Sequence, residues 1–484
     1  MRKKVKKALP KTKKKSKNMI LLKSSFKKER GWEAAKNSRL NFGWKSSLEN
    51  INQKISEQLN TLKARARDAQ QNDAVVNSYL STCIKNTIGS EGIQLKMKAT
   101  DNGGTLDTYA NQIIEKAWLE FSKSPTVSDD LSLKDVLKLI HQQERLDGEA
   151  IVIMHEGIGN AWNFGIEIID STYLDATYNE VLDSGNKIIC GIELNSWGKP
   201  VNYYFKTPPS TLSAYALDNT DRKKIPARNV LHLYTKLIPS AVRGVPPIAP
   251  VLGDIKTLND YIEAELMAAK LGAAKMGWIV DGENAPYVPD SDTNGDAIDV
   301  VEPGTIGHLQ AGQQFQSFLP EHPTTQFPEF VKMILKRVSA CLGLSYNTLI
   351  NDFSDANYSN MRAASLSDRE TFKVMQDELI ETILQPMFER FLFIQLANKN
   401  INLPVTKFDE FKAANWIPRR WDWVDPLKDI QASKVELELG LTSKARILAE
   451  KGLDYEEIKA EIAKEEPIKI EEKVDPNNDK PKDI

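Results

Sequence analysis

The chain has 484 residues, 41% of them hydrophobic and 27% charged, with a mean hydropathy of −0.41 and a formal net charge of −2. This length exceeds what one ordinary core supports, so we expect two to four structural units. No apolar run approaches membrane-span length, and three scattered cysteines make no disulfide framework, which favours a soluble, intracellular protein.

The two ends of the chain carry little apolar surface. The first thirty residues hold fourteen Lys and Arg against one Glu, and the stretch from Pro467 onward is acidic-leaning and rich in Pro and Asn. We expect both ends to be disordered, because neither can bury enough apolar surface to offset the ordering entropy. The run "MILL" at 19–22 is too short for a secretory signal.

Three uses of the basic arm stay open. It can bind nucleic acid through counterion release, bind an acidic protein surface, or remain a solvated extension. It contains no interleaved aromatic residues, which disfavours base stacking on a single strand. The residues that define the arm are Lys3, Lys4, Lys6, Lys7, Lys13, Lys14 and Lys15.

The first half of the chain predicts an α+β fold. Apolar spacing predicts helices within residues 49–88 and over "LSLKDVLKLIHQQERLDGE", which Gly148 ends. Short β-like runs follow, separated by turn signals such as "DSGNK". The predicted strands are 150–155, 164–170, 187–194, 201–206 and 229–234.

Two further helices flank a long insertion. The first, 254–274, has a small-residue face that allows close approach of another helix, from the same chain or from a neighbouring subunit. The second, 328–344, places Lys332 and Lys336 on one face. Its apolar face is predicted from Phe330, Ile334, Val338 and Cys341. Residues 275–327 between the helices are too long for a turn and need a role of their own.

The last part of the chain is also predicted to be helical. The polar strip "DFSDANYSNMR" (352–362) precedes a long amphipathic helix over 362–397, which Pro386 should kink. A final unit contains three tryptophans and then two helices, punctuated by Gly440 and Gly452.

No motif predicts catalysis or a bound cofactor. Residues 290–302 match the first positions of a calcium loop, but Val301 stands where a bidentate carboxylate is required, so we interpret them as an acidic solvated turn. The five histidines lack metal-ligand spacing, and no phosphate-cradling GxxxxGK[ST] is present. The sequence therefore predicts a protein that is not an enzyme, with no catalytic, cofactor-binding or metal-binding residues.

Eight segments, in order over roughly residues 35–465, resemble the lambda-type family of bacteriophage portal proteins. The Lys-rich extension before residue 30 and the Asp-rich stretch 283–299 depart from the family pattern. The segments are "NSYLSTCIKNTIGSEGIQLK" (77–96), "RLDGEAIV" (145–152), "GIELNSWGKPVNYYF" (191–205), "IPARNVLHLY" (225–234), "RGVPPIAPVL" (243–252), "VEPGTIGHLQAGQQF" (301–315), "CLGLSYNTLINDFSDANYSNMRAA" (341–364) and "WVDPLKDIQASKVELELGLTSKARILAEKGLDYEEI" (423–458).

The resemblance implies an α+β portal architecture with a mixed α/β wing, a two-helix stem, an α/β clip and an α-helical crown, assembled as a ring. The implied boundaries are a basic disordered arm at 1–30, the wing at 31–250, the first stem helix at 251–275, the clip at 276–327, the second stem helix at 328–350, a tunnel-side loop at 351–362, a long helix and wing return at 363–424, the crown at 425–466 and a disordered tail at 467–484.

The resemblance also implies a function in the virion. Portal proteins of this kind form a ring, usually dodecameric, at one capsid vertex, and double-stranded DNA passes through it during packaging and ejection. The implied partners are further copies of the chain, duplex DNA of any sequence, the terminase large subunit, the head–tail connector and the major capsid protein, with a scaffold protein as an additional candidate and no membrane. Assembly would take place in the host cytoplasm.

In this arrangement the polar strip would line the channel. Small neutral polar groups would keep the wall wet and sequence-blind, whereas a ring of cations would hold the DNA phosphates still. A plain surface loop is the alternative interpretation of the strip. The hypothesised channel-lining residues are Asp355, Asn357, Tyr358, Ser359, Asn360 and Arg362, and the hypothesised basic stem face is Lys332, Lys336 and Arg337.

Two other classes of function stay open. A polymer hydrolase using unidentified carboxylates predicts a monomer or dimer with turnover. A basic-armed nucleic-acid-binding protein without a ring predicts salt-dependent DNA affinity that is lost when residues 1–30 are deleted. A portal instead predicts a large closed assembly with little sequence-specific DNA binding.

Overall fold

In the computed structural model the chain divides into two compact units, Met1–Asn50 and Ile51–Ile484. The structure describes residues 35, 39, 42–45, 47–101, 104–206, 222–273, 277–281, 313–317, 326–354, 357–421, 426–450 and 455–464. The predicted basic arm, the acidic turn at 290–302 and the tail from residue 467 lie outside the described residues. The helices and strands named below belong to the second unit.

Local capping signals fix the ends of the first helices. The Asp73 carboxylate accepts a hydrogen bond from the backbone N–H of Val76, and Ser132 caps the fourth helix in the same way. Gly148 ends that helix in the left-handed conformation, as predicted. The helices are α1 (Ile51–Asn72), α2 (Ala74–Thr87), α3 (Thr108–Phe121) and α4 (Leu133–Asp147); α3 is absent from the predicted elements.

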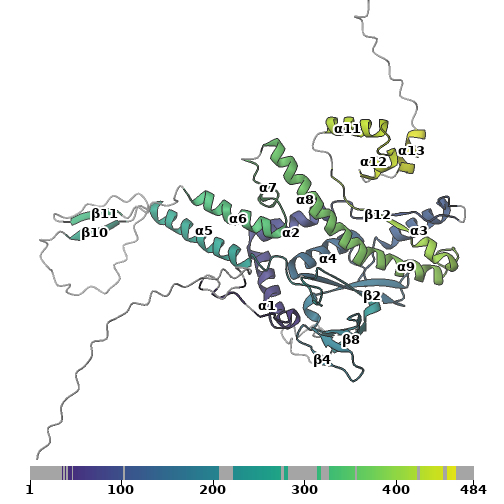
Figure 1. The fold of residues 1–484 in the computed structure, drawn as a ribbon, viewed down its shortest axis with the longest axis horizontal. Coiled ribbons are helices and arrows are strands. Elements are labelled where there is room, and N and C mark those ends of the chain that lie inside the picture. The colour runs from purple at the N-terminus through teal and green to yellow at the C-terminus, as the bar shows by residue number, and fades with distance from the viewer. Residues whose placement is uncertain are drawn as a thin grey trace, which may run out of the picture. The chain divides into compact units, whose positions relative to one another are not determined.

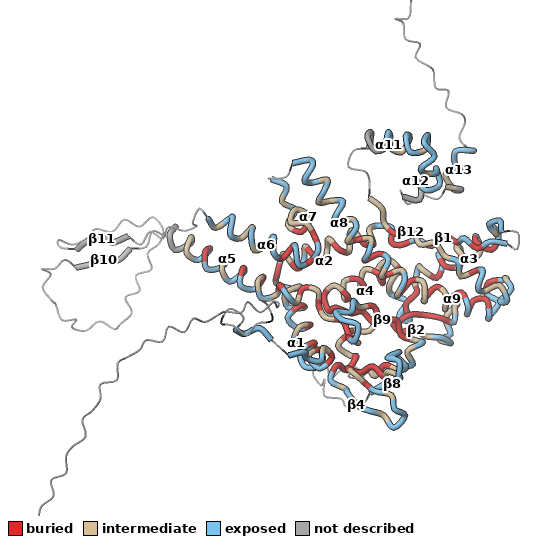
Figure 2. The backbone as a smooth tube through the Cα atoms, viewed as in Figure 1, coloured by how far each residue is buried: buried red, intermediate tan, exposed pale blue. Residues whose placement is uncertain are grey.

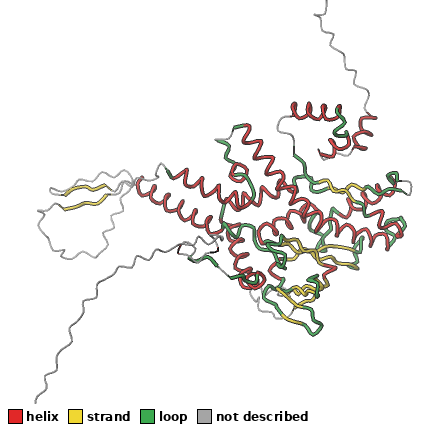
Figure 3. The backbone as a smooth tube through the Cα atoms, in the orientation of Figure 1, coloured by secondary structure: helices red, strands yellow, loops and turns green. Residues whose placement is uncertain are grey.

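Strands from the first half build two antiparallel sheets, which confirms the predicted α+β class (Figure 3). The three-stranded sheet has the order β3 (Phe164–Ile169), β2 (Glu149–Glu156), β9 (Val230–Tyr234). The five-stranded sheet has the order β4 (Glu180–Val181), β5 (Lys187–Ile189), β6 (Ile192–Leu194), β7 (Pro200–Lys206), β8 (Arg222–Pro226). Two strand pairs stand apart: β1 (Gln94–Met97) with β12 (Ala414–Ile417), and β10 (Gly277–Asp281) with β11 (Gln313–Ser317).

The single strand predicted over 187–194 is wrong. It is a hairpin of β5 and β6 with its turn at Cys190 and Gly191, both of which have positive φ. A side chain at Gly191 would place its Cβ 2.7 Å from the carbonyl oxygen of Asp175, so the close approach of a neighbouring segment requires glycine here. The apolar run continues through this turn, which is why the sequence pattern does not reveal it.

Strand β2 lies between two of the clusters that make up the core. Because side chains alternate across a strand, Val152 and Met154 pack with α3, α4 and α9 on one face. Ile151 and Ile153 pack on the other face with residues of β6 and β7. Figure 2 shows the buried backbone concentrated around β2, β9 and α4, while much of α5, α6 and the first part of α8 is exposed.

The second half is largely helical, as predicted (Figure 1). Helix α6 ends at Gly343, which is left-handed, so the segment expected as one second stem helix contains two helices. The described residues of the final unit form three helices rather than the predicted two. The elements are α5 (Leu252–Ala273), α6 (Phe327–Leu342), α7 (Tyr346–Ile350), α8 (Tyr358–Leu379), α9 (Gln385–Ala397), α10 (Phe408–Phe411), α11 (Pro426–Glu438), α12 (Lys444–Glu450) and α13 (Tyr455–Lys464).

Pro386, where a kink is predicted, directly follows a π-helical turn, Ile380–Leu384, between α8 and α9. The N–H of Gln385 donates to the carbonyl of Ile380, five residues back. Since proline has no N–H of its own, this wider turn lets the helix continue past Pro386. Short 3-10 turns lie at Ser171–Tyr173, Ala227–Asn229 and Val405–Lys407.

Candidate functional site

The predicted channel-lining strip is only partly a loop. Asn357 is the N-cap of α8, and its side chain accepts a hydrogen bond from the backbone N–H of Asn360. Tyr358, Ser359, Asn360 and Arg362 therefore lie in the first turns of a helix, which corrects the expected loop over 351–362. The sequence pattern misses this start because the first turns of α8 are mostly exposed and carry no apolar stripe. Asp355 lies outside the described residues.

The corner between α7 and α8 (residues 343–366) is fixed at its base. The hydroxyl and the N–H of Ser345 both donate to the Asp368 carboxylate, at 2.7 and 2.8 Å. Thr371 donates to the Gly343 carbonyl at 3.1 Å. The outer part is exposed: Tyr358 keeps 51% of its surface and Phe353 keeps 48%. A hydrogen-bonded base thus presents an exposed, mainly uncharged tip.

Helices α5 and α6 pack side by side in antiparallel directions (Figure 1). Arg337 and Asp254 form an ion pair, with 2.9 Å between Nε and Oδ2, and the ring of Tyr261 lies 5.5 Å from the ring of Phe330. A groove of about 420 Å³ runs between the helices, lined by Thr257, Leu258, Tyr261, Gln326, Phe330 and Ile334. Among the described residues, aromatic contacts and the Arg337–Asp254 ion pair join the two helices.

This helix pair leaves large apolar side chains uncovered. Leu266 is 53% exposed and Met333 is 59% exposed, and Ile262, Met267 and Phe330 are also exposed. The face of α6 that is buried in the core uses Leu335, Val338 and Leu342. The predicted apolar face, which included Cys341, is therefore rotated from the buried one, since Cys341 is exposed. Exposed apolar groups in such a cluster are typical of a surface that binds another protein.

The three residues of the predicted basic stem face have different contacts. Nζ of Lys332 lies 5.9 Å from the centre of the Tyr346 ring, and Arg337 is paired with Asp254. Lys336 is exposed on α6, and no described residue forms a hydrogen bond or ion pair with it.

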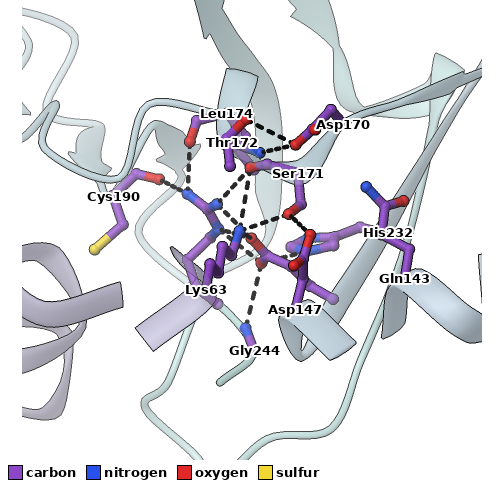
Figure 4. A network of polar contacts seen from close by, with 12 residues as sticks. Lys63, Gln143, Asp147, Asp170, Ser171, Thr172, Leu174, Cys190, His232 and Gly244 are labelled. Atoms are coloured by element: carbon purple, nitrogen blue, oxygen red, sulfur yellow. Dashed lines mark hydrogen bonds and ion pairs between the residues drawn. The ribbon is translucent and has the colours of Figure 1, made fainter. Parts of the chain in front are cut away.

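A buried ionic cluster, which the sequence pattern does not predict, connects the helices to the sheets (Figure 4). Glu149, at the start of β2, is fully buried. Its carboxylate accepts hydrogen bonds from Nζ of Lys63 at 2.7 Å and from Nε of Arg243 at 2.8 Å, and lies 3.0 Å from Nε2 of His232. Arg243 also donates to the carbonyl of Cys190 at 2.9 Å.

A second layer of this cluster reaches the surface. The Ser171 hydroxyl accepts from Lys63 and donates to Asp147, both at 2.7 Å. Arg67 pairs with Asp147 and with Asp170, at 2.9 Å from each. The positive charges of the two layers therefore equal the negative charges in number: Lys63, Arg67 and Arg243 against Asp147, Glu149 and Asp170.

Burial and the contacts within the cluster shift the pKa values of its side chains. Burial alone raises the pKa of Glu149, but the charges of Arg243 and Lys63 outweigh burial and hold that pKa well below its usual value. Burial lowers the pKa of His232, so its imidazole is neutral at pH 7. Burial raises the pKa of Asp170, but hydrogen bonds from Arg67 and Thr172 outweigh burial and lower the pKa to about 2. These groups are held in one charge state rather than poised to exchange protons.

We expect acid to destabilise the fold below about pH 6.5. Burial, helped by the charge of Arg145, holds the pKa of His141 well below 6.5. Stability from a lowered pKa is complete above the unfolded value and is lost as the pH falls below it, by about 1.4 kcal/mol per pH unit for each such group. Replacing His141 with Leu should flatten the fall in thermal midpoint between pH 7 and 5. An unchanged slope would contradict this assignment.

No arrangement typical of a metal site occurs among the described residues: no three His, Cys, Asp or Glu side chains are grouped to hold an ion. His155 instead contacts Glu167 at 2.7 Å on the surface of the sheet. In the same part of the chain, no helix is long and apolar enough to cross a bilayer.

Comparison with known proteins gives matches over most of the chain. The family described as "Phage portal protein, lambda family" matches residues 37–376. The "Probable portal protein" of Halomonas phage phiHAP-1 is 29% identical over 451 residues, which cover 90% of this chain and 86% of that protein. Portal protein B of Escherichia phage lambda is 25% identical over 167 residues, 33% of this chain and 31% of that protein.

Solved structures with a similar chain come from gene transfer agent particles. A chain from the "Neck of empty GTA particle computed with C6 symmetry" has a TM-score of 0.45 and 12% identity, and the match covers 82% of this chain and 93% of that one. A chain from the "Virion of native gene transfer agent (GTA) particle" has a TM-score of 0.44 and 10% identity over the same shares.

Proposed function

Because this chain belongs to the lambda family of phage portal proteins, we propose that it forms a closed ring of about twelve copies that conducts double-stranded DNA at one capsid vertex. Portal proteins are structural components of phage particles, so the chain is not an enzyme. That family membership removes the hydrolase alternative. A basic-armed nucleic-acid-binding protein without a ring remains the competing outcome of the test below.

The exposed apolar side chains of α5 and α6 carry the proposal of a ring. Ile262, Leu266 and Met333 are exposed on this helix pair. Leaving such apolar surface in water costs free energy, and a neighbouring copy would cover it. A contact between two different faces of the chain, repeated by rotation, closes into a ring. Helices α5 and α6 are the proposed stem.

The tip of the α7–α8 corner is the proposed channel wall. Its exposed side chains are mainly uncharged: Ser359 and Asn360 lie in the first turn of α8, and Phe353 and Tyr358 are aromatic. DNA phosphates would find few cations to bind there, so duplex DNA of any sequence could slide past. The fixed base of the corner, through Ser345 and Asp368, would keep the tip at a constant position.

The remaining partners are proposed from family membership alone. Residues 276–327, of which the structure describes β10 and β11, are the proposed clip that would dock the terminase large subunit and later the head–tail connector. The major capsid protein and a scaffold protein would contact the outside of the ring. Assembly in the host cytoplasm and incorporation into the virion follow from this role.

Native mass spectrometry of the purified chain, with negative-stain images of the same sample, tests the proposal. We expect closed rings of about twelve subunits with a central hole. A monomer or dimer at micromolar concentration would refute the ring. Salt-dependent DNA binding by such a species, lost on deletion of residues 1–30, would instead favour the basic-armed nucleic-acid-binding protein.

Replacing Ser359 and Asn360 with Arg should reduce DNA packaging severalfold while leaving ring assembly intact, because added cations in the wall would hold the phosphates. Asn357 is left unchanged, since losing the cap alone would destabilise α8 by about 1 kcal/mol. The matched control replaces the same two residues with Gln, which adds length without charge. Equal packaging by the Arg and Gln variants would remove this tip from the channel wall.

A further inference from the structure

We propose that α5 of one copy packs antiparallel against α6 of the next copy through two matched stripes of charged and apolar side chains. This inference rests on the proposed ring and specifies the faces and the register by which neighbouring copies meet. The surface partner is therefore a second copy of this chain.

The stripe on α5 consists of Glu263, Leu266 and Lys270. Residues spaced by three, four and seven positions share one face of a helix. All three are exposed. Tyr261 marks the other side of α5, because its ring contacts Phe330 of α6 within the same chain. The stripe thus faces away from the internal helix pair.

The stripe on α6 consists of Glu329, Met333 and Lys336, again within one face and all exposed. Val338, in contrast, is buried in the core, and Phe330 lines the groove toward α5. The stripe therefore occupies a third side of α6, which neither the core nor α5 covers.

The charges in both stripes have no partner within the described part of the chain. Other charges on the same helices do: Lys256 pairs with Asp260 at 3.2 Å, and Arg337 pairs with Asp254 at 2.9 Å. No hydrogen bond or ion pair to a described residue is present for the four stripe charges, Glu263, Lys270, Glu329 and Lys336.

The two stripes are complementary when the helices run antiparallel. Each stripe spans about seven residues, or about 10.5 Å, with an acid at its N-terminal end, a base at its C-terminal end and an apolar residue between them. In α5 the apolar residue lies three positions from the acid, and in α6 it lies three positions from the base. A single register therefore aligns all three pairs: Glu263 with Lys336, Leu266 with Met333, and Lys270 with Glu329.

This register differs from the one inside the chain. There, Asp254 lies opposite Arg337 and Tyr261 opposite Phe330. The proposed contact is displaced along the helices by about eight residues, roughly 12 Å, and uses other faces. It joins two different surfaces, so it is a heterologous contact of the kind that closes into a ring. Exposed ion pairs are individually weak, so here they would select the register while the apolar residues are buried.

Two charge-reversal variants test the contact. Variant A carries Glu329→Lys and Lys336→Glu, and variant B carries Glu263→Lys and Lys270→Glu; neither changes the net charge. Each variant alone would bring like charges together at both pairs. We expect the concentration for half-maximal ring assembly to rise roughly tenfold or more for either variant. The control, Lys256→Glu with Asp260→Lys, reverses an internal pair on the same helix and should assemble normally.

Mixing A and B in equal amounts should restore rings, because α6 of A then matches α5 of B, and α6 of B matches α5 of A. Native mass spectrometry should show equal numbers of the two chains in each ring. The variant with all four changes should also assemble, which would exclude misfolding as the cause of the single-variant defects.

Rings formed normally by A or B alone, or a mixture that fails to assemble, would overturn this contact while leaving the proposed function intact. Heterodimers without rings would also overturn it, since they would indicate a two-fold contact. Failure of the unchanged chain to form rings would instead refute the proposed function.

Discussion

Replacing Glu149 with Ala is expected to lower the free energy of unfolding by about 3–5 kcal/mol, because Lys63 and Arg243 would remain buried without their shared carboxylate. The loss should appear as a large decrease in the urea midpoint of the full chain. Ring assembly should fail at urea concentrations that the unchanged protein tolerates, because the variant is already unfolded there.

Asp170→Ala provides the control for this experiment. Asp170 belongs to the same network and pairs with Arg67, but 39% of its side chain is exposed. Solvent screens such a pair, so the expected loss is below about 1 kcal/mol. Should the Glu149 variant prove as stable as the Asp170 variant, the buried cluster would not be what joins α1 to the sheets.

Replacing Gly148 with Ala should destabilise the fold by about 2–4 kcal/mol. Gly148 has φ of 84°, and a Cβ there would lie 2.1 Å from the backbone carbon of Val245. Gly244 lies against the same turn, since a Cβ there would lie 1.9 Å from the carbonyl oxygen of Gly148. The two glycines let two backbone segments meet directly beside Glu149, whose carboxylate accepts from the N–H of Gly244 at 3.3 Å.

Gly253→Ala is the matched control for that substitution. Gly253 lies in the first turn of α5, and a Cβ there would meet no atom within 4 Å. Alanine favours the helix over glycine, so the expected change is neutral or stabilising by about 0.5 kcal/mol. Comparable losses in both variants, measured as thermal midpoints, would refute the steric explanation for Gly148.

The elements that sequence periodicity predicts are those whose burial is itself periodic. Helix α4 is an example, since its buried side chains recur at helical spacing. Strand β2 is predicted differently, as a short continuous apolar run, because both of its faces are buried. The start of α8 escapes the same reasoning, because its first turns are mostly exposed and only the cap at Asn357 marks them. Strands β1 and β12 also escape it, because each is four residues long and its partner lies more than three hundred residues away.

Some features of the candidate site can likewise be predicted from the sequence, and others cannot. The paired helices α5 and α6, the insertion between them and the polar strip follow from apolar spacing and from the resemblance to the portal family. The orientation of those helices does not. Apolar spacing places Cys341 with Val338 on the predicted apolar face of α6. The face that is buried contains Val338 together with Leu335 and Leu342. The stripes on α5 and α6 become visible only once that rotation is known.

The sequence by itself determined the family, the mixed α+β class and the approximate ranges of α4, α5 and α6, because caps, glycines and apolar spacing act within a few residues of each other. Only the tertiary structure decided that Lys63, Glu149 and Arg243 meet in one buried cluster. These residues come from segments far apart in the chain, and each alone resembles an ordinary surface charge. Their pairing depends on long-range packing that excludes water, which no local pattern encodes.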